Sequence, residues 1–226
     1  MDQIDFERCK LIACAAVIEE MLPFIPPRMS YEVMDFGLHT DPKSLKRALQ
    51  NEIDSSAPDI QAILLGYGLC SQAVVGLRSG RRTLVMPRVD DCIAIFLGSA
   101  AEYQRQCSMV PGTYYLTRGW IESDNTPFSE YDILVKGYGE QIAKRIIKQI
   151  LKNYTRLAFI ATGDNNLEYY REHSRNMAER FSLRYQEIQG SPILIKKMLY
   201  GPWNDEFVII PPGKTVSFFD FRENRP

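Results

Sequence analysis

Three of the five cysteines follow apolar segments that are typical of buried strands. Cys14 ends the segment CKLIAC, Cys70 directly follows ILLGYGL, and Cys92 comes shortly after RRTLVMP. A thiolate is a nucleophile and also a strong ligand for zinc and for iron–sulfur clusters. In a parallel sheet all strands end at the same edge, so these three thiols should gather where such sheets bind their ligands.

A purely structural role has to be weighed against this interpretation. A single free cysteine more often fills space in a core than serves a site, whereas three at equivalent strand ends favour a shared function. Cys9 and Cys107 lack that placement, so we expect them to lie apart. The odd cysteine count and the lack of any C-x-x-C pair argue against a disulfide framework and a zinc finger, so a metal site would have to be assembled by the fold.

Residues beside these cysteines extend the predicted site. His39 follows the strand candidate YEVMDF and could approach the same edge, where it would complete a tetrahedral zinc site. Gly66, Tyr67 and Gly68 form a corner before Cys70, and the two glycines permit a sharp turn and a close approach to a bound molecule. Predicted helix starts near the cysteines would lower the pKa of each thiol and favour the thiolate.

Substrate binding is expected at the same edge. Arg88 and Asp91 lie in the loop between the strand RRTLVMP and the next helix, and a guanidinium there could grip a carboxylate or a phosphate. Arg88 could equally pair with the neighbouring aspartates as a structural residue. Gly66 and Gly68 begin like a dinucleotide-binding fingerprint, but Ser71 stands where its third glycine belongs, so nucleotide binding is a minor alternative.

The elements that must position these residues alternate along almost the whole chain. Strand patterns cover 9–15, 31–36, 60–66, 81–87, 112–120, 156–162 and 206–212, and helix patterns cover 16–22, 41–54, 90–106, 138–154, 167–181 and 192–199. Several strands are apolar on both faces, which predicts a three-layer α/β fold: a mostly parallel sheet with helices on both faces. We expect a single domain over residues 1–226, within which 110–226 could form a sub-lobe.

Composition limits the function further. The 226 residues are 45% hydrophobic and carry a net charge of -1, which gives no indication of nucleic-acid or membrane binding. The most apolar stretch, 92–101, is too short to span a bilayer, and the polar start MDQIDFERCK is no secretory signal, so we expect a cytoplasmic protein. The aromatic tail SFFDFRENRP could dock on a second copy of the chain in a homo-oligomer, although packing on its own domain is favoured.

Several segments are similar to a known family. LLGYGLC, MPRVDDCIAIFLGS and PGTYYLTRGWIE, with IAC, GLH and PPG elsewhere, resemble the DUF1638 proteins over nearly the whole chain. The resemblance implies an anaerobic setting, because the family occurs mainly in anaerobic bacteria and methanogenic archaea, often near corrinoid-dependent methyltransferase components. It implies no settled reaction. It marks as motif positions Cys14, His39, Cys70, Arg88, Asp91 and Cys92. Members often have a histidine where this chain has Asp90, so a histidine ligand at that place is absent.

We therefore predict a metal-binding protein whose site is formed by Cys14, Cys70 and Cys92, with His39 as a further ligand. A [4Fe–4S] cluster with one open position is favoured over zinc because of the anaerobic setting. The protein would be an enzyme or an accessory factor in methyl-group or sulfur-group metabolism, acting on a small anionic substrate held by Arg88; whether it is an enzyme stays open. The alternative is a non-catalytic protein that holds a small molecule or a corrinoid at the same edge, with corrinoid methyltransferase components as partners. A third interpretation is an α/β domain with cysteines in its core.

Overall fold

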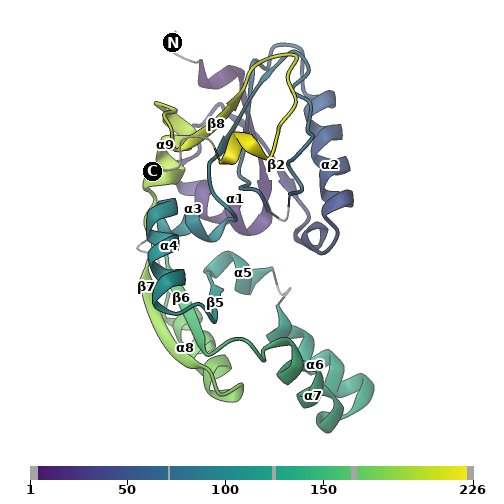
Figure 1. Ribbon diagram of the computed structural model, residues 1–226, viewed down its shortest axis with the longest axis vertical. Coiled ribbons are helices and arrows are strands. Elements are labelled where there is room, and N and C mark those ends of the chain that lie inside the picture. Colours follow the sequence, from purple (N-terminus) through teal and green to yellow (C-terminus); the bar gives the residue numbers. More distant parts are fainter. Residues whose placement is uncertain (1–4, 71, 124–125, 164–166, 223–226) are drawn as a thin grey trace. The chain divides into compact units, whose positions relative to one another are not determined.

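The computed structural model describes residues 5–70, 72–123, 126–163 and 167–222, and it confirms the α/β class. The chain divides into two compact units (Figure 1). The first contains residues 1–100 and 191–226, and the second contains residues 101–190. Each unit has its own sheet, whereas the sequence pattern suggested a single sheet for the whole chain. None of the helices among the described residues has both the length and the apolar character needed to cross a bilayer.

The first unit is built on a five-stranded sheet in the order β2-β1-β3-β4-β8. Four strands are parallel: β1 (Cys9–Cys14), β2 (Ser30–Met34), β3 (Ala62–Leu65) and β4 (Thr83–Pro87). The last, β8 (Phe207–Ile210), returns from the end of the chain and pairs antiparallel with β4. The sheet is therefore mostly parallel, as predicted.

Helices cover this sheet on both sides. The chain runs outward from β1 to β2 through α1 (Ala15–Met21), then back past β1 to β3 through α2 (Pro42–Ser55). Because crossovers are right-handed, a reversal of direction places the two helices on opposite faces. Figure 1 shows α2 on one side of the strands and α1 with α9 (Ile193–Tyr200) on the other. Short 3-10 helices complete the unit at Phe6–Arg8, Leu22–Phe24, Phe36–Thr40 and Phe219–Phe221.

The predicted helix over 41–54 forms as α2 for the expected reasons. Asp41 accepts a hydrogen bond from the Lys43 amide, Pro42 occupies the first turn, and a buried stripe at helical spacing faces the sheet, formed by Leu45, Leu49 and Ile53. In contrast, the predicted helix over 90–106 is split in two. Gly98 adopts a left-handed φ of 86° and ends α3 (Ile93–Leu97), so α4 (Ala100–Met109) begins as a separate helix.

The reversal also defines a topological switch point. β2 and β3 flank β1 on its two sides, and the connections from β1 and from β2 run in opposite directions along the sheet. In open α/β sheets the crevice at such a point, outside the carboxyl ends of the strands, is where ligands bind. The carboxyl ends of β1 and β3 are therefore the natural location for a site in this unit.

The second unit has a smaller parallel sheet in the order β5-β6-β7, with β5 at Thr113–Leu116, β6 at Arg156–Ala161 and β7 at Arg184–Gln189. Its helices after α4 are α5 (Arg118–Glu122), α6 (Pro127–Tyr138), α7 (Glu140–Ile150) and α8 (Glu168–Arg180). Its strands follow one another in sequence order, so this sheet contains no switch point. The buried core includes Leu116, Phe128, Ala143, Ile147, Leu157 and Phe159.

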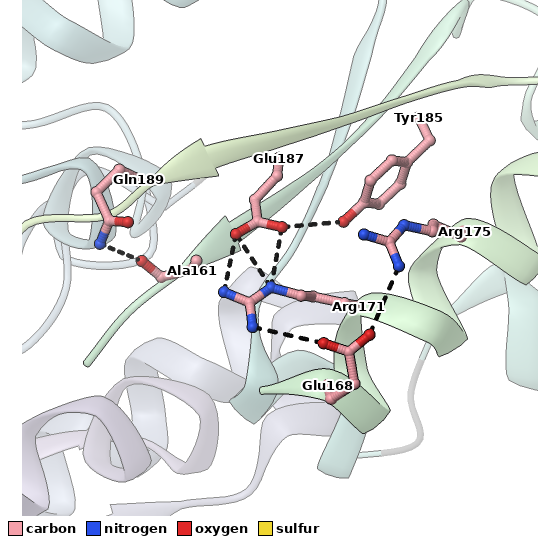
Figure 2. A network of polar contacts seen from close by, with 7 residues as sticks. All are labelled: Ala161, Glu168, Arg171, Arg175, Tyr185, Glu187 and Gln189. Atoms are coloured by element: carbon pink, nitrogen blue, oxygen red, sulfur yellow. Dashed lines mark hydrogen bonds and ion pairs between the residues drawn. The ribbon is translucent and has the colours of Figure 1, made fainter. Parts of the chain in front are cut away.

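A polar network joins α8 to the edge strand β7 (Figure 2). The Arg171 guanidinium donates to both carboxylate oxygens of Glu187, with Nε–Oε2 at 3.0 Å, and lies 3.8 Å from Glu168. Glu168 also pairs with Arg175, whose guanidinium lies over the Tyr185 ring. These contacts cover one face of the edge strand with charged groups.

Candidate functional site

The three predicted cysteines lie at the carboxyl edge of the first sheet. Cys14 is the last residue of β1, Cys70 lies in the loop after β3, and Cys92 precedes α3 in the loop after β4. These strands are adjacent and parallel, and β1 and β3 border the switch point. All five cysteines are free thiols. Cys9 lies at the opposite end of β1, and Cys107 belongs to α4 in the second unit.

The corner before Cys70 is held between the neighbouring strands by its backbone. The Gly66 amide donates to the Ile12 carbonyl at 2.9 Å, and the Leu69 amide donates to the Val89 carbonyl at 2.9 Å. A Cβ on Gly66 would lie 2.5 Å from Ala13 Cβ, and one on Gly68 would lie 2.6 Å from the Val89 carbonyl oxygen. The glycines therefore permit close packing against the chain itself, and their contact with a bound molecule stays a prediction.

Cys70 has an unusual backbone for a residue with a side chain. Its φ is 43°, in the left-handed region that glycine prefers. Hydrogen bonds fix it there, since its amide donates to the Asp90 carbonyl at 3.0 Å and its own carbonyl accepts from the Ala73 amide at 3.2 Å. Such conformations cost about 1–3 kcal/mol and persist where the surrounding structure imposes them.

Burial raises the pKa of all three thiols. The pKa of Cys14 rises to about 11, because the effect of burial exceeds the opposing effect of the Ala16 and Val17 amides at the start of α1. The pKa values of Cys70 and Cys92 are also raised, first by burial and then by Cys14 and the Asp91 carboxylate. The thiols thus influence one another electrostatically. The expectation that helix starts lower the pKa of these thiols and favour thiolates is wrong, because the effect of burial is larger.

Tyr67 lies near the three cysteines, and His39 lies next to Tyr67. Tyr67 is 1% exposed, its hydroxyl has no hydrogen-bond partner in the described part of the chain, and burial followed by the three thiols raises its pKa. Its ring stacks on His39 at a centroid distance of 6.0 Å. Nδ1 of His39 lies 3.0 Å from the Phe36 carbonyl oxygen, which can only accept, so the proton is on Nδ1 and the lone pair is on Nε2. Burial lowers the pKa of His39, which favours the neutral ring.

Arg88 and Asp91 differ in their placement. The Arg88 guanidinium donates to the carbonyls of Asp205 at 2.8 Å and Phe207 at 3.0 Å, and also to that of Asp220. The guanidinium N–H groups therefore bind the C-terminal segment, which favours a structural role for Arg88 over the expected role in substrate binding. Asp91 accepts from the Ile93 amide at 2.9 Å and raises the pKa of Cys92, so it lies with the thiols.

The cluster does not form a ready-made metal site. Within the described ranges, no three His, Cys, Asp or Glu side chains are arranged to hold a metal ion. The sequence located the thiols and His39 by their places after strands, but the buried, unpartnered Tyr67 hydroxyl became evident only from packing. The sequence named Tyr67 as a substrate-binding candidate through its place in the Gly66–Gly68 corner, and it did not indicate the burial of its hydroxyl.

Comparison with known proteins identifies one family. No curated protein and no solved structure is detectably similar to the chain. A family model described as a protein of unknown function, DUF1638, matches residues 33–199, a range that contains His39, Cys70 and Cys92 and begins after Cys14. The chain belongs to the DUF1638 family.

Proposed function

We propose that Cys14, Cys70 and Cys92 bind a metal centre at the carboxyl edge of the five-stranded sheet. The observation that carries this proposal is the gathering of three thiols, two of them on buried cysteines, with a buried Tyr67 hydroxyl that has no hydrogen-bond partner among the described residues, at the carboxyl edge of the sheet. A buried group that lacks a partner is unfavourable, and a native structure that keeps one calls for an explanation. A bound metal centre would supply anionic hydrogen-bond acceptors for the Tyr67 hydroxyl. Its positive charge would stabilise the thiolates of the three cysteines.

The raised thiol pKa values fit this role. Metal ligation needs thiolates, so a centre entering this environment would displace the thiol protons and stabilise the resulting charges. No three side chains of the described residues are already arranged to hold a metal ion, and a cysteine sulfur changes position by rotation about χ1. We therefore expect binding to be accompanied by rotamer changes at the three cysteines.

The surrounding residues have distinct roles in this proposal. The Nδ1–H of His39 donates to the Phe36 carbonyl, which leaves the lone pair on Nε2, an arrangement common for metal-binding histidines. The Tyr67 hydroxyl would donate to a thiolate or to a ligand in an open position. An iron–sulfur cluster bound by three cysteines leaves one iron open to substrate, whereas zinc would recruit His39 as the fourth ligand.

The proposed reaction class rests on the setting that the family resemblance implies. We favour a methyl-group or sulfur-group transfer in anaerobic metabolism, with an iron–sulfur cluster ahead of zinc and corrinoid methyltransferase components as partners. Since Arg88 is engaged by the C-terminal segment, recognition of an anionic substrate would fall to groups at the edge other than its guanidinium.

Anaerobic purification followed by metal and sulfide analysis tests the proposal. Wild-type protein and the Cys107→Ser control should carry the same metal stoichiometry, and Cys70→Ser and Cys92→Ser should each lose most of it while remaining folded. Iron with sulfide would support the cluster, and zinc alone would support the tetrahedral site. A folded wild-type protein that takes up neither would contradict the proposal and favour the non-catalytic alternative, which a corrinoid titration then examines directly.

A further inference from the structure

A second candidate site lies in the second unit, at the amino ends of β6 and β7. A groove of about 660 Å³ runs between α7 and the end of α8. This volume falls in the range of small-molecule pockets, about 300–1,000 Å³. The groove belongs to a single unit, and the thiol cluster lies in the other one.

Positive charge is concentrated along one side of this groove. Lys144, Lys148 and Lys152 are spaced four residues apart, which places them on one side of α7 and of the turn that follows it. Arg180 contributes a fourth cation, and Glu140 is the acidic residue among the described lining residues. Such a cluster is notable in a chain with a net charge of -1.

Two of these cations have partners and two are available. Lys144 pairs with Glu140 at 2.7 Å, and Arg180 pairs with Asp132 at 3.1 Å. Lys148 and Lys152 are exposed, and neither takes part in an ion pair in the described part of the chain. Neighbouring lysines one helical turn apart present two mobile ammonium groups to a ligand with several negative charges.

The other residues that line the groove include apolar and aromatic side chains. Leu151 and Leu183 are buried beneath it, and the Phe181 ring is half-buried. Tyr154 is 36% exposed, so part of its ring is open to solvent. The groove thus combines an apolar surface with a cationic rim, an arrangement suited to an anion that carries a ring.

We propose that this groove binds a phosphorylated small molecule with an aromatic ring. Its phosphates contact Lys148 and Lys152, and its ring packs against Phe181 and Tyr154. Lysine is a common phosphate ligand because its compact charge needs no fixed planar geometry. The site is independent of the proposed metal centre, so failure of one leaves the other unaffected.

Calorimetric titration at low ionic strength tests the site with three probes: ATP, pyrophosphate and adenosine. ATP should bind, pyrophosphate should bind more weakly, and adenosine should bind weakest, because charge supplies most of the attraction. Lys148→Glu/Lys152→Glu should weaken ATP binding about 100-fold, the scale of two lost charge-assisted contacts. Lys136→Glu/Arg145→Glu reverses two exposed charges on α6 and α7 outside the groove and should change the affinity less than about threefold.

Each contrary result would overturn a defined part of the proposal. No ATP binding by the wild-type protein, or equal weakening by both double variants, would remove the site. Equal binding of ATP and pyrophosphate would refute the role of the ring, and equal binding of ATP and adenosine would refute the role of the lysines. Lys148→Gln/Lys152→Gln provides a milder variant in case charge reversal perturbs folding, and it should still weaken ATP binding at least about 10-fold.

Discussion

Replacing Arg88 with lysine separates an architectural role from a substrate clamp. The guanidinium donates to three carbonyls, those of Asp205, Phe207 and Asp220, and so fastens the segment that contains β8 and the following tail to the end of β4. A lysine keeps the charge but lacks the planar fork, so it would keep about one of the three contacts. Each lost hydrogen bond at this half-buried position costs about 1 kcal/mol, so we expect a loss of about 2 kcal/mol in the free energy of unfolding of the first unit.

The assay must report on the first unit alone. The chain has two tryptophans, and Trp203 lies in the first unit while Trp120 lies in the second. In a Trp120→Phe background, urea unfolding followed by fluorescence therefore reports on the unit that contains Arg88. Arg81→Lys, at an exposed position on the preceding turn, serves as the control and should shift stability by less than about 0.5 kcal/mol. If Arg88→Lys left stability unchanged and instead weakened binding of an anionic ligand, the architectural interpretation would be refuted.

Further expectations follow from the same contacts. Gly68→Ala should destabilise the first unit by about 2–3 kcal/mol, because the added Cβ would lie 2.6 Å from the Val89 carbonyl oxygen. In contrast, Gly137→Ala in α6 should stabilise the second unit by about 0.5–1 kcal/mol, because its Cβ meets nothing described within 4 Å. Similar urea midpoints for the two variants would contradict this. Burial raises the pKa of Cys9 to about 11, so its stabilising contribution is complete below about pH 9 and is lost as the pH rises to about 11. Removing that thiol in Cys9→Ala should reduce the fall in unfolding free energy between about pH 8 and pH 11 by about 2 kcal/mol, and an undiminished fall would refute the assignment.

Local patterns were sufficient to predict the α/β class and the edge where the thiols gather. Asp41, Pro42 and an apolar repeat predict the helix α2, and short apolar runs such as 9–14, 62–65, 83–87 and 207–210 form strands. Parallel strands then force Cys14, Cys70 and Cys92 to one edge, because the chirality of crossovers leaves little choice. These inferences need only neighbouring residues and general rules of chain geometry.

The remaining features depend on contacts between distant parts of the chain. The partners of Arg88 lie more than a hundred residues further along, and no local pattern around Pro87 indicates them. The left-handed Gly98, whose Cβ position is closely approached by the distant Ser191, interrupts a segment that the sequence pattern predicts as one continuous helix. Thiol pKa values depend on burial, which follows from the packed sheet and outweighs the helix starts visible in the sequence.

X-ray absorption spectroscopy of anaerobically purified protein tests the central claim most directly, because it counts the sulfur atoms around the metal. The account predicts a first coordination shell made mainly of sulfur: three cysteine sulfurs at about 2.3 Å if the metal is zinc, or sulfide together with cysteine sulfur if it is an iron–sulfur cluster. This sulfur scattering should be reduced in Cys70→Ser but not in Cys107→Ser. A spectrum with only nitrogen and oxygen ligands, or one unchanged by Cys70→Ser, would contradict it.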